Sequence, residues 1–243
     1  MHSQSKRTHD GIPLEELFGY ARFSTPRYSP CASYLAYLAP TPDGAPTIWL
    51  KSLTSAQPDR AVIPSYKRPI TNINWLPDSK HIVFIKDTDG DERGHLYVCN
   101  IETGTVIDAS PYPERRVLPH YYTSPKHPSH VVFFSNKRDI TRYDVIRYCA
   151  ATNTHTVIAE NPGDVLTWHI DGNLDLRAHV TFNTKNELAL YTRVTVDDPW
   201  KQQLTWLAPD PSSSHSLFFS PCGAYLYFAD TTHTETNLLQ RLD

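Results

Sequence analysis

Long apolar runs are missing from this sequence of 243 residues. A membrane-spanning helix needs about 20 mostly apolar residues in succession, and no stretch of the chain approaches that length. The first ten residues are polar, and no apolar run of signal-peptide length follows them. These absences predict a protein without a membrane span and with a cytoplasmic location.

Long runs of one charge are missing as well. The chain has 23 basic and 26 acidic residues and a net charge of −3. Nothing in this balance points to nucleic acid or to an acidic membrane surface as a partner. Glycine is scarce, with nine residues, whereas there are 20 prolines and 14 tyrosines. This composition favours short strands interrupted by turns over long helices.

A catalytic serine motif is also missing. The nucleophile elbow of many hydrolases needs Gly-x-Ser-x-Gly, because only small flanking residues permit its strained turn. No serine of this chain is bracketed by glycines in that way. The serines at 212–214, beside His215, indicate a solvated loop. A triad assembled from distant serine, histidine and aspartate residues stays open.

The twelve histidines do not form a recognisable metal site. His127 and His130 are the closest pair, but we expect them in a turn, and their spacing is not one that recurs in zinc sites. The acidic loop from Asp87 to Glu92 lacks the glutamate of an EF-hand at the twelfth position, where this chain has Val98. We expect neither a metal nor another cofactor.

What the sequence does contain is a repeated turn. Ser-Pro or Leu-Pro pairs place prolines at positions 30, 77, 125 and 221, the last three lying 47, 95 and 191 residues after the first. A step of about 48 residues fits all four if a degenerate copy lies near residue 173, where the chain has Asp171-Gly172. Strand-rich units of about 40–50 residues are typical of β-propeller blades.

The second copy predicts a complete blade. Alternation predicts a strand over residues 70–75, a proline turn follows, and the apolar run 81–85 suits a strand buried on both faces. Two further strands are predicted over 95–100 and 105–108, joined by tight turns. Because the other copies repeat this order, we predict an all-β fold, a β-propeller of about five four-stranded blades.

The predicted blades cover approximately residues 23–65, 66–113, 114–160, 161–210 and 211–243, after an N-terminal segment of residues 1–22. The last copy stops at the end of its third strand, which leaves two interpretations. Either the N-terminal segment supplies the missing strand and closes a five-bladed ring, or the chain is an incomplete part of a seven- or eight-bladed propeller. Residues 12–19 alternate poorly, which favours the second. Exposed apolar faces would then promote self-association.

The four cysteines occupy repeated positions. Cys31 and Cys222 directly follow Ser-Pro in their copies, and Cys99 matches Cys149 near the end of a third strand. Equivalent positions in different blades lie farther apart than the ~4.4–6.8 Å between Cα atoms that a disulfide allows. We therefore predict four free thiols.

The turns and the segments between them resemble one family. The resemblance is carried by 17–19, Tyr34 to Pro40, Asp87 to Glu92, His95-Leu96-Tyr97, Glu102-Thr103-Gly104, Ser110 to Pro113, 159–164 and 236–243. In this order they are similar to the propeller of the prolyl oligopeptidase family of serine peptidases, in its dipeptidyl aminopeptidase/acylaminoacyl-peptidase branch. The resemblance runs from about residue 12 to residue 243.

This resemblance implies a function. Members of the family join the propeller to a C-terminal α/β-hydrolase domain with a Ser-Asp-His triad, and the propeller restricts entry to short or unstructured peptides. By this likeness the chain is a propeller portion that lacks the catalytic domain and is not catalytic alone. It gates or binds a peptide substrate, and its other partner is the hydrolase domain or another protein.

The resemblance also implies site residues. In the family an acidic propeller loop contacts the amino end of the substrate or an arginine of the hydrolase domain, which carries substrate binding over to Asp91 and Glu92. The following Arg93-Gly94 departs from the family pattern. Arg177 is expected to form an ion pair within the fold.

Two alternatives stay open. A short propeller that stands alone could be an enzyme of a biosynthetic pathway, with polar groups of the innermost strands converging on the central channel. The candidates for that role are Asn72, Asn74, His120, Tyr122 and Thr167. The chain could instead be a protein-interaction scaffold, as many propellers are.

Overall fold

A computed structural model describes residues 19, 21–42, 44–64, 68–207, 217–230, 236 and 238–242. Residues 212–215 and most of the N-terminal segment, which the sequence analysis singled out, lie outside these ranges. Every regular element within them is a β-strand. In this part of the chain no helix is long and apolar enough to cross a membrane.

The strands pair into five antiparallel sheets, each built from one continuous stretch of chain with its strands in sequence order. The first sheet contains β1 (Ser24–Tyr28), β2 (Tyr34–Thr41), β3 (Gly44–Ser52) and β4 (Arg60–Ala61). The second contains β5 (Asn74–Trp75), β6 (His81–Lys86), β7 (His95–Asn100) and β8 (Val106–Asp108). The third contains β9 (Val117–Ser124), β10 (His127–Asp139), β11 (Arg142–Cys149) and β12 (Thr154–Ala159).

The remaining two sheets complete this series. The fourth contains β13 (Val165–Ile170), β14 (Leu176–Phe182), β15 (Glu187–Thr192) and β16 (Lys201–Leu207). The fifth has three strands among the described residues, β17 (Phe218–Phe219), β18 (Leu226–Asp230) and β19 (Leu238–Leu242). The predicted all-β propeller of about five blades is confirmed.

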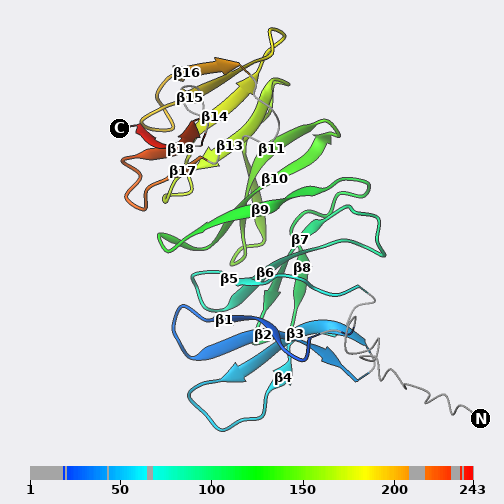
Figure 1. Ribbon diagram of the computed structural model, residues 1–243. Coiled ribbons are helices and arrows are strands. Elements are labelled where there is room, and N and C mark those ends of the chain that lie inside the picture. The colour runs from blue at the N-terminus through cyan, green and yellow to red at the C-terminus, as the bar shows by residue number, and fades with distance from the viewer. Residues whose placement is uncertain are drawn as a thin grey trace, which may run out of the picture.

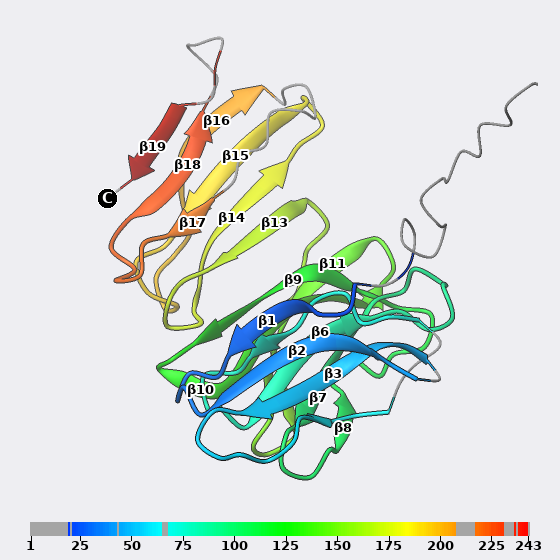
Figure 2. The same ribbon diagram turned by 60° about the horizontal axis from the view of Figure 1, so that its bottom comes forward.

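The sheets follow one another along an arc. Figure 1 shows the first sheet at one end, the fifth at the other, and the second, third and fourth between them. The turned view in Figure 2 keeps the first and fifth sheets apart. No strand pairing joins the first sheet to the fifth within the described ranges. These five sheets therefore form an open arc.

Apolar clusters fill the junctions between neighbouring sheets. In β6, Ile82 and Phe84 belong to the cluster against the first sheet, and Val83 belongs to the cluster against the third. All three side chains are fully buried. Burying a side chain of this size contributes about 1.5–3 kcal/mol, so this strand stabilises two junctions at once. The prediction that the second strand of a blade is buried on both faces is confirmed.

The turn predicted from the degenerate copy is closed by hydrogen bonds similar to those of an intact copy, but it is one residue shorter. At Ser29 the N–H donates to Tyr34 O at 2.9 Å, and the carbonyl accepts from Ala32 N at 2.8 Å. At Asp171 the N–H donates to Asp175 O at 2.9 Å, and the carbonyl accepts from Leu174 N at 3.0 Å. The turn geometry thus survives without serine and proline.

Two local predictions were wrong. His127 and His130 lie in β10 and not in a turn, because Ser124 pairs directly with His127 and only Pro125-Lys126 separates the two strands. The strand expected over 70–75 is reduced to β5. Ile70 and Ile73 are buried against neighbouring sheets, so the apolar spacing there reports packing and not a hydrogen-bonded ladder.

The turns between the first and second strands link each sheet to the next. Each link is a hydrogen bond between residues roughly one repeat apart. The four links are Cys31 N to Ser79 Oγ (3.0 Å), Asp78 N to Pro128 O (3.0 Å), Ser124 Oγ to Gly172 O (2.5 Å) and Arg177 Nη1 to Gly223 O (2.9 Å). They lie on one edge of the arc and fix the spacing of the sheets.

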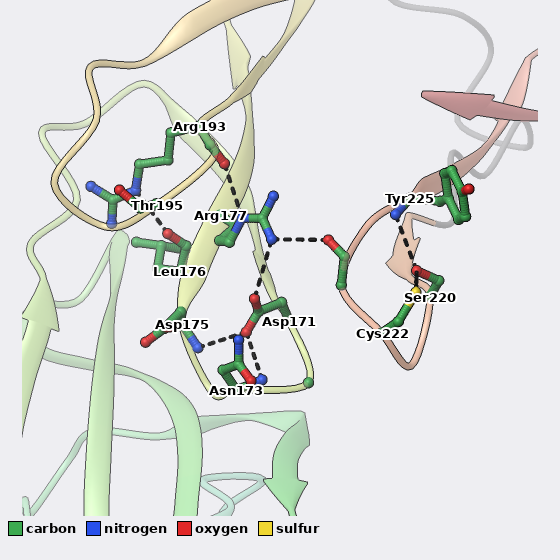
Figure 3. A network of polar contacts seen from close by, with 12 residues as sticks. Asp171, Asn173, Asp175, Leu176, Arg177, Arg193, Thr195, Ser220, Cys222 and Tyr225 are labelled. Carbon is green, nitrogen blue, oxygen red and sulfur yellow. Dashed lines mark hydrogen bonds and ion pairs between the residues drawn. The ribbon is translucent and has the colours of Figure 1, made fainter. Parts of the chain in front are cut away.

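The last link belongs to a larger polar network, shown in Figure 3. Arg177 Nη1 lies 3.4 Å from Asp171 Oδ2, and the two side chains are 18% and 1% exposed. Asp171 Oδ1 accepts from the N–H groups of Asn173 at 2.8 Å and Asp175 at 3.0 Å, which closes the turn. Arg177 Nε donates to Arg193 O at 3.0 Å. The ion pair predicted for Arg177 is thus present within the fourth sheet, and the bond from the same guanidinium to Gly223 O joins that sheet to the fifth.

Replacing Asp171 should destabilise the fold more than replacing an exposed turn aspartate. Asp171→Ala leaves the half-buried Arg177 without its carboxylate and opens the turn, so we expect a loss of about 3 kcal/mol. Asp139 also accepts hydrogen bonds in a turn and pairs with Arg142, but its side chain is 36% exposed. Asp139→Ala should cost less than about 1 kcal/mol. Urea unfolding measures both, and equal losses would contradict this account.

Candidate functional site

A groove of about 770 Å³ lies between the second and third sheets. We call it the 2–3 groove. Its walls come from the β4–β5 connection, the β6–β7 hairpin and the start of β9. The lining residues are Arg68, Pro69, Thr71, Ile85, Lys86, Asp87, Glu92, Gly94, Arg116, Val117, Leu118 and Pro119.

The two predicted substrate-binding residues occupy different places in the β6–β7 hairpin. Asp91 Oδ1 accepts from Arg93 N at 3.0 Å and from Thr88 N at 3.3 Å. The Arg93 N–H is the main cause that lowers the pKa of Asp91. Glu92 lines the groove, and its carboxylate forms no hydrogen bond or ion pair with any other described residue. Asp91 shapes the loop, and Glu92 is available to a ligand.

Cationic side chains stand around Glu92 in the same groove. Arg68 pairs with Asp87 at 3.6 Å, and Lys86 Nζ donates to Asp87 O at 3.0 Å. On the opposite wall Arg116 Nε donates to Tyr143 Oη at 2.7 Å. The lining thus carries three cations and two carboxylates. Such a lining can pair with a ligand that has charges of both signs.

A close backbone contact fixes the hairpin against β9. Val117 N donates to Gly94 O at 2.8 Å. At Gly94 a Cβ atom would lie 2.9 Å from Ile85 Cγ2, so the chain there passes too near Ile85 for any side chain. The groove is therefore built from elements that are joined to each other, and Glu92 stands two residues from the joint.

The residues considered for a central-channel site fall into two groups. Arg27 joins Asn72 and Asn74, with Nη2 3.5 Å from Asn72 Oδ1 and Nε 3.2 Å from Asn74 Oδ1. His120 and Thr167 line one cavity of about 250 Å³, and the Tyr122 ring lies 6.4 Å from that of His120. Burial lowers the pKa of His120. The first group serves to link the first and second sheets.

Two histidine–aspartate pairs resemble parts of a catalytic triad. His81 Nδ1 lies 2.7 Å from Asp78 Oδ2, and His95 Nδ1 lies 2.8 Å from Asp108 Oδ2. The serine near the second pair is Ser110, whose N–H donates to Asp108 Oδ1 at 2.8 Å. Its Oγ accepts from Leu96 N at 2.9 Å. In a triad the serine bonds to the imidazole, and within the described ranges no serine hydroxyl contacts either ring.

Candidate metal ligands do not gather in the structure. The rings of His127 and His130 are 5.7 Å apart. Within the part of the chain that the structure describes, no group of three or more histidine, cysteine, aspartate and glutamate side chains is placed to hold a metal ion.

Comparison with known proteins finds similarity to part of two peptidases. No family model matches it. Dipeptidyl aminopeptidase BIII of Pseudoxanthomonas mexicana is 26% identical over 166 residues, which are 68% of this chain and 24% of that protein. Dipeptidyl peptidase family member 6 of Caenorhabditis elegans is 22% identical over 235 residues, 90% of this chain and 31% of that protein.

Solved structures agree on the fold. Prolyl oligopeptidase B from Galerina marginata superposes with a TM-score of 0.58 at 16% identity, over 91% of this chain and 32% of that one. The β-propeller domain of the Trilobed protease from Pyrococcus furiosus gives 0.54 at 14% identity, over 91% and 67%. These similarities support a propeller of the prolyl oligopeptidase family. The chain spans between 24% and 31% of the length of the curated relatives that it matches.

Sequence reasoning missed part of the propeller's groove. It named Glu92 but neither Arg68 nor Arg116, which line the same groove from the β4–β5 connection and from β9. Their spacing from Glu92 follows no motif. The only available signal was the repeat, since a hairpin between the second and third strands of one blade must lie near the first strand of the next.

The thiols of this propeller should differ in reactivity. All four cysteines are free, as predicted. Cys31 is exposed, and hydrogen bonds, mainly with the Ser29 hydroxyl, lower its pKa to about 6, whereas burial raises the pKa of Cys99 to about 12. The thiolate is the nucleophile. With iodoacetamide at neutral pH, mass spectrometry should therefore find Cys31 alkylated well before Cys99.

The control is the same reaction in urea, where all four cysteines should react at similar rates. Alkylation of Cys99 as fast as Cys31 in the native protein would contradict the prediction.

Proposed function

We propose that this propeller binds the amino end of short peptides in the 2–3 groove and gates their access to a hydrolase domain, in the cytoplasm. The observation that carries the proposal is the Glu92 carboxylate, which lines a groove of about 770 Å³ and has no hydrogen-bond or ion-pair partner among the described residues. A carboxylate held in a groove and left without a protein partner favours an ammonium ligand.

The rest of the groove supports a peptide. Arg116 and Lys86 supply donors for peptide carbonyl groups or for a carboxylate. The apolar residues Val117 and Pro119 provide a wall for a side chain. One of the relatives is a dipeptidyl aminopeptidase, an enzyme class that acts at the amino end of a peptide. Both observations favour recognition of a free amino group.

Catalysis is assigned to a separate hydrolase domain. The chain has no Gly-x-Ser-x-Gly segment, and Ser110 is bonded to Asp108 and to Leu96 N in place of an imidazole. The polar groups that resemble a triad therefore hold strands together. The proposed partners are a peptide substrate and the hydrolase domain.

Peptide binding should depend on Glu92 and on a free amino end. In calorimetric titration with a short peptide, Glu92→Gln should weaken binding about two- to fivefold, because an exposed ion pair contributes about 0.2–1 kcal/mol. N-acetylation of the peptide should weaken binding to the wild type by a similar factor and should have little effect on the variant. Glu102 is an exposed glutamate in the β7–β8 turn, remote from the groove. Glu102→Gln is the matched control and should bind normally. Equal affinity for the free and acetylated peptides would refute amino-end recognition.

The chain alone should not hydrolyse peptides. We expect no turnover of aminoacyl or acyl-peptide chromogenic substrates and no labelling by a serine-directed fluorophosphonate, since no serine is activated by an imidazole within the described ranges. Turnover that the fluorophosphonate blocks would overturn this part of the proposal, and it would leave the peptide-binding measurement unaffected.

A further inference from the structure

A second groove, of about 460 Å³, lies between the third and fourth sheets. We call it the 3–4 groove. One wall is the end of β12 with the segment that follows it, and the other is the face of the fourth sheet formed by β13, β14 and β15, which lie side by side in Figure 2. It shares no lining residue with the 2–3 groove.

Four rings make up the floor of the 3–4 groove. Trp168, His179 and Tyr191 are directly opposite one another on neighbouring strands. The His179 ring stacks on Tyr191 with centroids 5.1 Å apart and an interplanar angle of 8°. Trp200 meets His179 edge-on at 4.3 Å. Only 7% of His179 is exposed, and its Nδ1 has no hydrogen-bond partner.

Charges of opposite sign lie at the two ends of this floor. Arg193 N donates to Arg177 O, near the start of β14, and the Arg193 guanidinium lies 4.3 Å over the Trp200 ring. Asp164 is at the other end, where its carbonyl accepts from Phe182 N. Glu160 lines the groove as well; its side chain is 66% exposed and pairs with Arg138 Nε at 3.7 Å. The Asp164 carboxylate has no hydrogen bond or ion pair with any other residue in the described ranges.

Asp164 is the carboxylate of this groove that is left for a cation. The lining holds two carboxylates and one arginine, but Glu160 already pairs with Arg138, whereas Asp164 has no ion pair within the described ranges. His179 is neutral at pH 7 because burial lowers its pKa to about 4. Aromatic faces attract cations, and the contact between Arg193 and Trp200 shows that one ring already holds a guanidinium. The free end of the aromatic floor lies toward Asp164.

We propose that the 3–4 groove binds a basic side chain of a peptide, with the cation over the aromatic floor and paired with Asp164, while Glu160 adds negative charge nearby. The basic group enters from the Asp164 end, because Arg193 repels a cation at the other. This site would select peptides or protein segments by lysine or arginine content, independently of the amino end.

The test uses the tryptophans of the groove as reporters. N-acetyl-argininamide should change the intrinsic fluorescence saturably, because Trp168 and Trp200 line the site. N-acetyl-citrullinamide has the same shape without the charge and should bind about two- to fivefold more weakly. The preference should shrink as salt is raised, since the pair is near the surface. Equal binding of the two probes, or no saturable change with either, would overturn the proposal.

Variants assign the effect to this groove. Asp164→Asn combined with Glu160→Gln should remove the preference for arginine over citrulline, whereas Glu102→Gln should keep it. Both replaced carboxylates are exposed, so thermal melting should be nearly unchanged. If the double variant unfolds at a clearly lower temperature, the proposal is tested by the wild type alone: a preference for arginine over citrulline that does not shrink as salt is raised would refute it. A preference that survives in a folded double variant would refute the site.

Discussion

Hydrogen bonds between residues about one repeat apart hold this propeller together. Cys31 bonds to Ser79 and Ser124 to Gly172, in each case 48 positions away, and Arg177 bonds to Gly223, 46 positions away. Since a blade contacts only its neighbours, every junction must be built from its own pair of sheets. The apolar clusters obey the same rule, because one strand such as β6 supplies side chains to two junctions. A substitution that breaks one of these hydrogen bonds should therefore destabilise the two sheets that it joins before the others.

The same constraint places the grooves. A hairpin that leaves one sheet can reach only the first strand of the next, so the β6–β7 loop meets β9 and encloses the 2–3 groove with it. The 3–4 groove arises one junction later, where β12 faces the aromatic row of the fourth sheet. Equivalent junctions thus form two grooves with different linings, one rich in cationic side chains and one rich in aromatic side chains. The chemistry of each depends on loop residues that the repeat leaves free to vary.

Much of the fold was predictable because it is periodic. The strand over 95–100 and the turn at Asp171-Gly172 both follow from the repeat and are present. The failures were local: the spacing of Ile70 and Ile73 reflects burial without strand pairing, and a two-residue loop carried β10 back to His127. The site was only half predictable. The sequence indicated an acidic loop. It could not show that Asp91 accepts hydrogen bonds from backbone N–H groups of the loop while Glu92 does not. No sequence pattern indicates that Arg68 and Arg116 line the same groove as Glu92.

The distribution of polar groups supports the proposal that this propeller binds peptides. Asp171, Asp78 and Asp108 close turns or hold imidazoles, and Ser110 is committed to Asp108 and to the backbone of Leu96. These are the residue types from which a triad is assembled, but here their polar groups form the hydrogen bonds that stabilise the blades. The carboxylates of Glu92 and Asp164 are not used in this way within the described ranges, and each lies in a groove at a junction. A carboxylate that the described residues leave unpaired attracts a cation from outside, which is why the proposed peptide sites are placed at these two positions.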